Sequence, residues 1–334
     1  MTVQTIRRNG NIMGEWVGWW GAIVVGLLGG CGPSTSELDS SGGPLLGING
    51  ARLVTDGTPW DKPPGLSLNG LSSDGLSKNG LSHNGLLKTG LSEEGFSAAS
   101  FREWFNTGST DLSDEVMRYV VRCALAENKV LMWINPVTLE KYSWPGELGL
   151  ASNWAEGHPA TEKEQQVITA CLAAHVNKFG ARVPFSILGE TAQGEPLEIE
   201  EGELEVFSRR EGAFFGNLFQ DEGVFSCQDP TFITSPRESS LRTCANFQPG
   251  KEVESQCAPL QVVGFCNGAL RCELDATRTY FHTCQYQGKT YRALTTHMRS
   301  LDIARCGDGA CQPSESCGAG QVANSCAADC GPCP

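Results

Sequence analysis

The sequence lacks the motifs that mark the common enzyme classes. It contains no G-x-S-x-G nucleophile elbow, no H-E-x-x-H zinc motif, no P-loop and no dinucleotide-binding glycine fingerprint. Histidine is scarce, with 5 residues in 334, and the spacing of these residues does not indicate a zinc cluster. The usual serine hydrolase, metalloprotease, nucleotide-binding and dehydrogenase chemistries are therefore not supported by sequence motifs.

Positive charge is also in short supply. The chain has 25 Lys and Arg against 38 Asp and Glu, which gives a net charge of −13. Nucleic-acid binding needs clustered Lys and Arg to neutralise phosphates, so this balance argues against nucleic acid as a partner. A surface this acidic also avoids nonspecific contact with anionic lipid.

Long apolar runs are missing as well. Trp16–Leu28 has 13 residues, too few to cross the roughly 30 Å bilayer core as a mature helix. It follows Arg7-Arg8 and leads into Leu28-Gly29-Gly30-Cys31, a layout typical of a secretory signal peptide over residues 1–30. Leu28-Gly29-Gly30-Cys31 resembles a bacterial lipobox, which implies that Cys31 becomes the N-terminus and carries lipid.

This resemblance implies an exported protein in the cell envelope, attached to the membrane through the lipid on Cys31. Gly32 rather than Asp follows the cysteine, which favours the outer membrane under the sorting rule known for enteric lipoproteins. An ordinary cleaved signal with a spare cysteine and a retained anchor helix are the alternatives.

Cysteine is the residue that the sequence has in excess. Of 15 cysteines, Cys31 is set aside for lipid, and the remaining fourteen form a group of eight and a group of six. Both groups can pair completely, and disulfides persist outside the cytosol, so parity and the signal peptide agree. We expect disulfides at Cys123, Cys171, Cys227, Cys244, Cys257, Cys266, Cys272, Cys284, Cys306, Cys311, Cys317, Cys326, Cys330 and Cys333.

A tether and a repeat come before the folded body. Residues 31–63 are rich in Ser, Gly, Pro and Asp and predict a tether. Over residues 64–97 a glycine followed by Leu, and in the last unit by Phe, recurs every five residues. This period fits neither a strand nor a 3.6-residue helix. It resembles the pentapeptide-repeat family, which implies a short β-solenoid with Leu or Phe pointing inward; a flexible spacer is the alternative.

The middle of the chain predicts an α+β fold. Over residues 98–210 we expect a mixed helical domain, with helices starting at Ser113 and at the capping box Thr161–Glu164. Cys123 and Cys171 fall on the inward faces of these helices, so we expect them to pair with each other. Residues 211–303 alternate short β-like runs with Gly, Pro and Cys, which predicts a disulfide-linked β-rich region.

Further strands are expected at Val130–Trp133 and Val183–Leu188. Leu204 and Val206 alternate with glutamates, which predicts a half-buried strand with an acidic face.

Residues 304–334 form a separate six-cysteine module. Val322 is its one large apolar residue after Cys306, so the bridges must supply its stability. Its cysteines allow 15 pairings, among which the sequence does not choose. Cys306–Cys311, Glu315, Cys317 and Ala328–Gly331 resemble the short modules that end many myxobacterial secreted proteins. With the lipobox and the repeat, the chain resembles cysteine-rich myxobacterial lipoproteins, which implies an envelope location and no particular activity.

Three groups of residues are candidates for chemistry or ligand binding, each with a structural alternative. Cys171 and His175 lie one helical turn apart, so the imidazole could activate the thiol, but a bridge to Cys123 is the simpler interpretation. Asp308, Glu315 and Asp329 lie on loops where carboxylates suit Ca²⁺, or they cap turns. The tryptophans either stack on a ligand or pack the core: Trp60, Trp104, Trp133, Trp144 and Trp154.

These features predict an envelope lipoprotein that acts as a binding or structural module for another surface protein or a glycan. An extracellular hydrolase with a nonstandard site is the alternative, using His158, His175 or the run Glu198–Glu205. A purely mechanical spacer is the third. A flat apolar patch would favour binding, whereas a deep pocket with two of these groups converging would favour the hydrolase.

Non-reducing peptide mapping by mass spectrometry of protein from the native membrane fraction tests the cysteine assignments together. We expect a diacylated Cys31 and Cys123 bonded to Cys171, because the lipobox and the inward positions of the two later cysteines require both. An unmodified Cys31 together with a free Cys171 would contradict the anchor and the parity argument.

Overall fold

The computed structural model describes residues 66–68, 70–177, 183–233, 235, 237–240, 242, 257–267, 272–312, 314–318 and 325–333. The chain divides into Met1–Pro44 and Leu45–Pro334, and every described residue belongs to the second unit. The signal segment 1–30, the tether 31–63, Cys31, Trp60 and Cys244 lie outside the described residues. None of the helices that the described residues form is long and apolar enough to cross a membrane.

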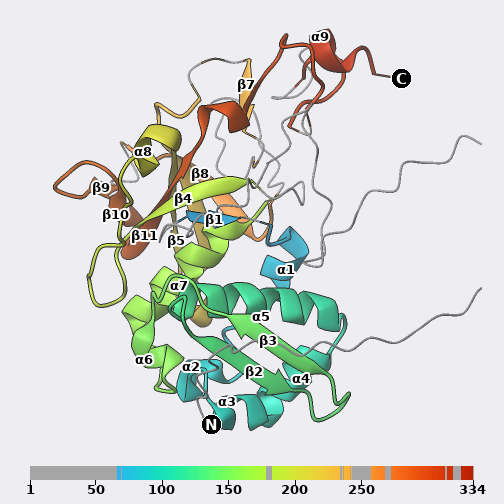
Figure 1. Cartoon of the computed structure of the whole chain (residues 1–334), viewed down its shortest axis with the longest axis vertical. Helices are drawn as coiled ribbons and strands as arrows, with labels where there is room; N and C mark the ends of the chain where they lie inside the picture. The colour runs from blue at the N-terminus through green and yellow to red at the C-terminus, as the bar shows by residue number, and fades with distance from the viewer. Residues whose placement is uncertain are drawn as a thin grey trace, which may run out of the picture. The chain divides into compact units, whose positions relative to one another are not determined.

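Two long helices organise the described body. α5 (Thr110–Ala124) begins at Ser109, whose side chain accepts a hydrogen bond from Leu112 N, so the expected start at Ser113 was wrong by one turn. α7 (Glu162–His175) begins at the expected capping box, in which Thr161 and Glu164 cap each other's backbone. α7 lies between the main sheet and α5 (Figure 1), and all its residues from Glu164 to His175 are buried.

The period-five repeat forms short helices instead of a solenoid. The described part contains α1 (Ser73–Lys78), α2 (Leu86–Thr89) and α3 (Glu93–Ser97), which lead into α4 (Ala99–Asn106). The expected β-solenoid is therefore not found among the described residues. The apolar residues of the six units from Leu71 onward are nevertheless buried in the main core, which a free spacer would not allow: Leu71, Leu76, Leu81, Leu86, Leu91 and Phe96.

Serine and glycine explain how a five-residue unit turns. Ser72 and Ser92 cap α1 and α3 by accepting from the backbone N–H three residues later. Between helices the chain needs glycine: Gly80 has a φ of +60°, and a Cβ there would lie 2.1 Å from Trp104 Nε1. Helices or turns in the described units from Leu71 onward thus place the leucines inward.

The main sheet combines strands from distant parts of the chain. Its order is β1-β4-β11-β5-β6-β8, with β10 pairing with β11 and β9 pairing with β10. All pairings are antiparallel except the parallel one between β6 and β8. The strands are β1 (Leu66–Leu68), β4 (Pro184–Gly189), β5 (Arg209–Gly216), β6 (Val224–Gln228), β8 (Leu260–Phe265), β9 (Glu273–Leu274), β10 (Phe281–Tyr286) and β11 (Lys289–Met298).

The two faces of this sheet have separate cores. Phe185, Ile187 and Phe214 join the main core under α7, which also contains the repeat leucines. Phe215 and Phe225 lie in the second core, together with Cys227, Cys266 and Cys284. The fold is therefore mixed α and β with several sheets, and its main core extends across the boundary expected at residue 210.

Smaller elements complete the body. β2 (Val130–Ile134) pairs with β3 (Lys141–Pro145), and β7 (Glu238–Ser240) pairs with β12 (Ile303–Arg305). The remaining helices are α6 (Ser152–Ala155), η1 (Leu218–Gln220), η3 (Ser300–Asp302) and α9 (Ala327–Cys330).

The strand expected at residues 204–206 was wrong. This segment is α8 (Glu203–Val206), which begins after Gly202, a residue with a φ of +81°. Glu203 is buried and its carboxylate accepts from Glu200 N, whereas Val206 is exposed. The alternation of Leu and Val with glutamate therefore reflects a short exposed helix.

Leu86→Ala tests whether the repeat belongs to the core. Because Leu86 is fully buried, we expect the substitution to lower the free energy of unfolding by about 3 kcal/mol in urea denaturation. Leu301→Ala is the control, since Leu301 is 70% exposed and should change stability by less than about 0.5 kcal/mol. Equal stability of the two variants would show that the repeat is not part of the folded body.

Candidate functional site

The outer side of the β2–β3 hairpin carries a concentrated apolar surface. We call Val130, Met132 and Ile134 of β2, with Val137 and Leu139 of the connecting turn, the hairpin face. These side chains are between 55% and 75% exposed, and they are five of the eight large exposed apolar side chains among the described residues. Single exposed apolar residues are normal, but a contiguous set on one element indicates an interaction surface.

The inner side of the hairpin is fixed by aromatic packing. Trp133 stacks with Tyr142 and Trp144, at centroid distances of 5.7 and 6.3 Å. Trp144 Nε1 donates to Asp114 Oδ1 of α5 at 2.7 Å, and Asn135 Nδ2 donates to Asn106 Oδ1 of α4 at 2.8 Å. The hairpin is thus held against α4 and α5, and its outer face is presented on a rigid support.

The turn holds a leucine in an unfavourable backbone conformation. Leu139 has a φ of +63°, in the left-handed region of backbone conformation that residues other than Gly, Asn and Asp rarely adopt. Its N–H donates to Asn135 O at 2.8 Å, and Val137 N donates to Asn135 Oδ1 at 3.0 Å, which closes the turn. A bulky apolar residue that is both exposed and strained points to a role outside the fold.

The tryptophans predicted as ligand-stacking candidates are core residues. Trp104, Trp133, Trp144 and Trp154 are all buried. Trp154 Nε1 donates to Leu86 O at 2.7 Å, which joins α6 to the repeat. The described tryptophans therefore follow the core-packing alternative.

The thiol nucleophile hypothesis is wrong. Cys171 is bonded to Cys123, the pairing expected from their inward positions, so it has no free thiol. His175 is buried between the rings of Tyr119 and Phe185, and its Nδ1 lies 2.8 Å from Cys171 O. These residues form a cross-link between α5 and α7.

The groups proposed for a nonstandard hydrolase site do not come together. His175 lies in the interior, whereas His158 is exposed beside α6, with Nδ1 3.2 Å from Asn153 O. Of the glutamate run, Glu198, Glu200, Glu201 and Glu205 are exposed and Glu203 caps its own segment.

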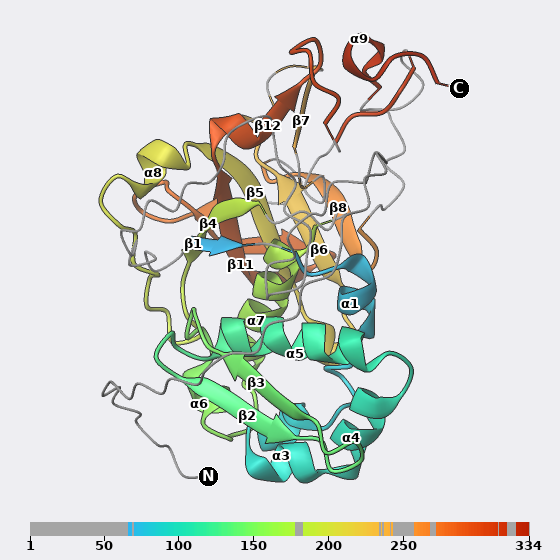
Figure 2. The ribbon, with the colours of Figure 1, turned by 45° about the vertical axis from the view of Figure 1, so that its right-hand side comes forward.

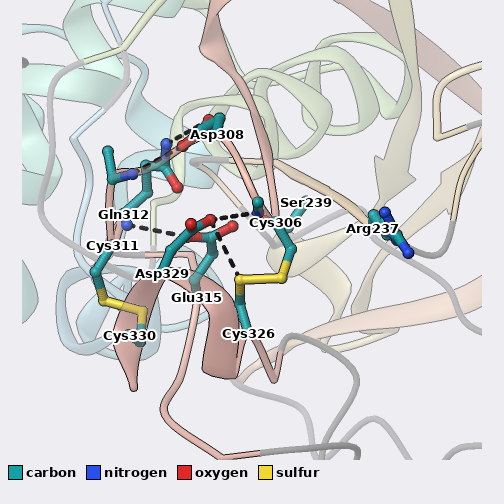
Figure 3. The surroundings of a disulfide bond; sticks show 12 residues. Arg237, Ser239, Cys306, Asp308, Cys311, Gln312, Glu315, Cys326, Asp329 and Cys330 are labelled. Carbon is teal, nitrogen blue, oxygen red and sulfur yellow. Dashed lines mark hydrogen bonds between the residues drawn. A yellow bond between two sulfur atoms is a disulfide. The ribbon is translucent and has the colours of Figure 1, made fainter.

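The terminal module is held by three bridges in a first-to-fourth, second-to-fifth, third-to-sixth order, and Figure 3 shows the first two of them. This resolves the pairing that the sequence left open. The bridges are Cys306–Cys326, Cys311–Cys330 and Cys317–Cys333.

The carboxylates of this module act as loop caps. Asp329 accepts from Gly307 N at 2.5 Å and Gly309 N at 3.0 Å, and Asp308 accepts from Ala310 N and Gln312 Nε2. Burial raises the pKa of Glu315, with Asp329 and Asp308 adding to the effect. The neighbouring sulfurs of Cys306 and Cys326 are bonded to each other, so they are not metal ligands.

Calcium needs six to eight oxygen ligands. Glu315 Oε1 is the carboxylate oxygen of the described module that is buried without a hydrogen bond. The described residues of the module therefore do not fit a calcium site, and the turn-capping alternative accounts for Asp308, Glu315 and Asp329.

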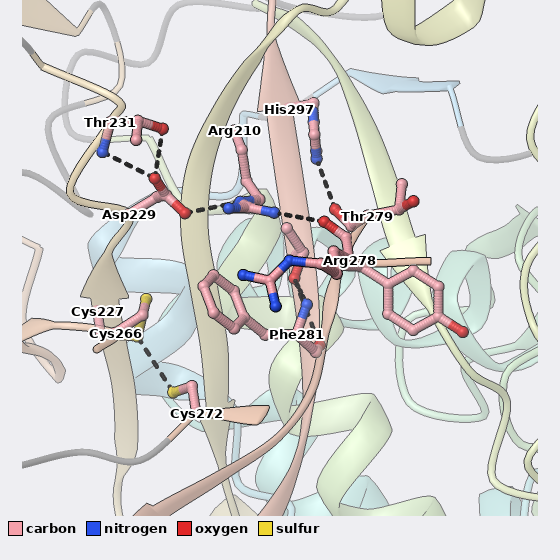
Figure 4. Close-up of polar contacts among 12 residues, drawn as sticks. Arg210, Cys227, Asp229, Thr231, Cys266, Cys272, Arg278, Thr279, Phe281 and His297 are labelled. Carbon is pink, nitrogen blue, oxygen red and sulfur yellow. Dashed lines mark hydrogen bonds and ion pairs between the residues drawn. A yellow bond between two sulfur atoms is a disulfide. The ribbon is translucent and has the colours of Figure 1, made fainter. Parts of the chain in front are cut away.

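Two further bridges lie near a polar network formed by residues of the interior strands β5 and β11 and of neighbouring loops, and Figure 4 shows this network with Cys227, Cys266 and Cys272. Cys227–Cys266 and Cys272–Cys284 approach so closely that Sγ of Cys227 lies 3.5 Å from Sγ of Cys272. Cys257 is also disulfide-bonded. Above these bridges, Arg210 donates to Asp229 at 2.6 Å and to Arg278 O at 2.9 Å.

His297 closes this network. Its Nδ1 lies 3.2 Å from Phe207 O and its Nε2 3.3 Å from Thr279 O. Burial lowers the pKa of His297 to about 4, although the two carbonyls favour the protonated ring and oppose the shift. The cation of Arg210 lowers this pKa further.

A scan against protein-family models and searches of curated proteins and solved structures find no match for this chain. Among the described residues, the feature that most clearly indicates an interaction with another molecule is the hairpin face. The sequence interpretation missed this face because Val130–Ile134 is apolar on both sides and reads as a buried strand. The informative signal is the partner strand, whose outward residues Lys141 and Ser143 are polar and exposed.

His297→Gln tests the role of burial of His297 on the interior strand β11. The unfolded ring protonates near pH 6.5 and the folded ring near pH 4. The unfolded state therefore binds more protons between these values, and the free energy of unfolding falls as the pH drops through this window. We expect the stability loss from pH 7 to pH 4.5 to be about 2 kcal/mol smaller in His297→Gln than in the unsubstituted chain.

Urea denaturation at the two pH values gives the comparison, with His158→Gln as the exposed control. An unchanged pH dependence in His297→Gln would show that His297 does not titrate with a lowered pKa.

Proposed function

We propose that this chain is an exported, lipid-anchored envelope protein that binds another surface molecule through the hairpin face. The hairpin face carries the proposal, because it is an exposed aliphatic surface on a rigid support. An apolar surface of this kind gains free energy when a partner removes it from water.

The disulfides support a location outside the cytosol. Bridges occur in the helical layer, behind the main sheet and in the terminal module. Such bonds are characteristic of an oxidising environment. Lipid attachment at Cys31 and an outer-membrane position complete the proposal and rest on the sequence pattern of residues 1–32.

A binding role agrees better with the structure than a hydrolase does. His175 is buried, whereas His158 and most of the glutamate run are exposed, so these groups do not form one site. His175 and Glu203 also make local contacts within their own segments. A passive spacer would have no reason to keep a strained, exposed Leu139 at the end of an apolar strand.

Met132→Glu tests the proposed surface. The chain from residue 31, with Cys31→Ser to remove the lipid, is exported behind another signal peptide and incubated with isolated envelope of the producing cells. We expect saturable co-sedimentation with the envelope, and at least a tenfold loss of affinity in Met132→Glu, because a charge at the centre of the hairpin face cannot be buried unpaired.

Leu301→Glu is the matched control, because Leu301 and Met132 are both 70% exposed. It should bind like the unsubstituted chain. Equal binding of all three proteins, or no saturable binding by any of them, would contradict the proposed function.

A further inference from the structure

Among the described residues, β2 has one edge with which no strand pairs. β2 and β3 form a two-stranded sheet, and β3 lies between β2 and α5 in both ribbon views (Figure 2). The contact of Trp144 with Asp114 ties β3 to α5. No strand among the described residues pairs with the other side of β2.

The backbone groups on this free edge belong to the residues of the hairpin face. Lys129 O accepts from Gly146 N at 2.8 Å, and Asn135 N donates to Glu140 O at 2.9 Å, so residues 129 and 135 face β3. Strand residues alternate in the direction of their N–H and C=O groups. Val130, Met132 and Ile134 therefore direct their backbone groups away from β3, at the edge of the apolar surface.

This combination selects a strand as the occupant of the hairpin face. A lipid surface would cover the apolar side chains but would leave the N–H and C=O groups of the edge without partners, at a cost of several kcal/mol for each buried group. An added strand satisfies these groups and covers the side chains at the same time.

The order of side chains selects β2 of a second copy. In an antiparallel pairing centred on Met132, Met132 lies opposite itself, and Val130 lies opposite Ile134 in both halves. The three residues that direct backbone groups outward are those that meet in this register, so each facing pair can exchange both hydrogen bonds. The side chains of every facing pair are aliphatic, on the same side of the joined sheet.

The flanking charges fit the same register. Lys129 of one copy comes opposite Asn135 of the other, and the neighbour of Asn135 across its own hairpin is Glu140. Lys129 and Glu140 are then two strand spacings apart, about 10 Å between Cα atoms. Both are exposed and lie on the same side of the strands, so opposite charges from the two copies come within side-chain reach.

We infer that the hairpin face is a homodimerisation surface, on which β2 strands of two copies pair antiparallel about Met132. This inference deepens the proposed function, because it names the occupant of the hairpin face. The interface is isologous, as two-fold symmetry requires. Attachment of both copies to one membrane would raise their local concentration and favour a contact of modest area.

Cysteine cross-linking in the full chain, within the envelope of the cells that make it, tests the register. Facing residues of a hydrogen-bonded pair have Cα atoms about 5.5 Å apart, within disulfide range. We expect Met132→Cys to give a covalent dimer on a non-reducing gel. Val130→Cys alone and Ile134→Cys alone should stay monomeric, because like residues are then about 13 Å apart along the strands.

Cells that make the Val130→Cys and Ile134→Cys chains together should form the mixed dimer. Leu301→Cys is the matched exposed control and should stay monomeric. Peptide mapping verifies in each variant that the native bridge Cys123–Cys171 is intact, so a folding defect is recognised. Dimer formation by Met132→Cys no greater than by Leu301→Cys, or equal cross-linking at all three β2 positions, would overturn the inference.

Envelope from cells that lack the gene separates this inference from the proposed function. Self-association predicts that the lipid-free chain binds envelope containing the protein and loses at least tenfold in binding to envelope without it. Undiminished, Met132-dependent binding to envelope without the protein would overturn the dimer while keeping the hairpin face as the binding surface. No Met132-dependent binding to either envelope, with no cross-linked dimer, would overturn both.

Discussion

The burial of α7 from Glu164 to His175 is the constraint on which the rest of the structure depends. A helix that is buried on all sides needs apolar cover from more than one layer, and here the main sheet and α5 provide it. The Cys123–Cys171 bridge fixes α5 to α7, and the edge-to-face contact of His175 with Phe185 joins α7 to the sheet. Because leucines of the repeat fill the same core, residues 70–97 of the repeat are part of the folded body.

The position of the hairpin follows from this arrangement. α5 presents Asp114 to Trp144, and α3 and α4 present Phe96, Phe101 and Phe105 to the inner face of the hairpin. The aromatic residues of β2 and β3 are thus used on the inner side together with Leu131, and Val130, Met132 and Ile134 of β2 are left on the outer side. The separation of the two kinds of apolar residue makes the hairpin both firmly held and available for contact.

Local signals in the sequence predicted local structure, and long-range features escaped them. The capping box at Thr161 predicted α7, because both capping partners lie within one turn. The strands expected at Val130–Trp133 and Val183–Leu188 correspond to β2 and β4, although the outer exposure of β2 was not predicted. The five-residue period resembles that of a β-solenoid, but the structure of this segment is set by serine caps and by packing against Trp104. The period alone does not show these contacts.

The buried pair Glu211–Arg242 shows why such features escape a reading of the sequence. Arg242 is fully buried, 3.1 Å from Glu211, with its guanidinium 4.5 Å from the ring of Phe185, and it donates to Ala174 O near the C-terminal end of α7. Burial lowers the pKa of Arg242, and the carboxylate of Glu211 opposes that shift. No spacing in the sequence connects these residues, because β5 and the helix end bring them together only in the folded chain.

Several buried or partly buried polar side chains have structural roles, which distinguishes them from the exposed hairpin face. Arg242, Arg210, His175 and Asp329 are each engaged by neighbours that stabilise the fold. A group in such a network is poorly placed for catalysis, because removing its partner leaves a buried charge or donor uncompensated. The hairpin face has the opposite character: its side chains contribute little to the core, one of them is held in a strained conformation, and the adjacent strand edge is unpaired within the described structure. These features are the basis of the proposal that a second copy covers the side chains and pairs with the edge.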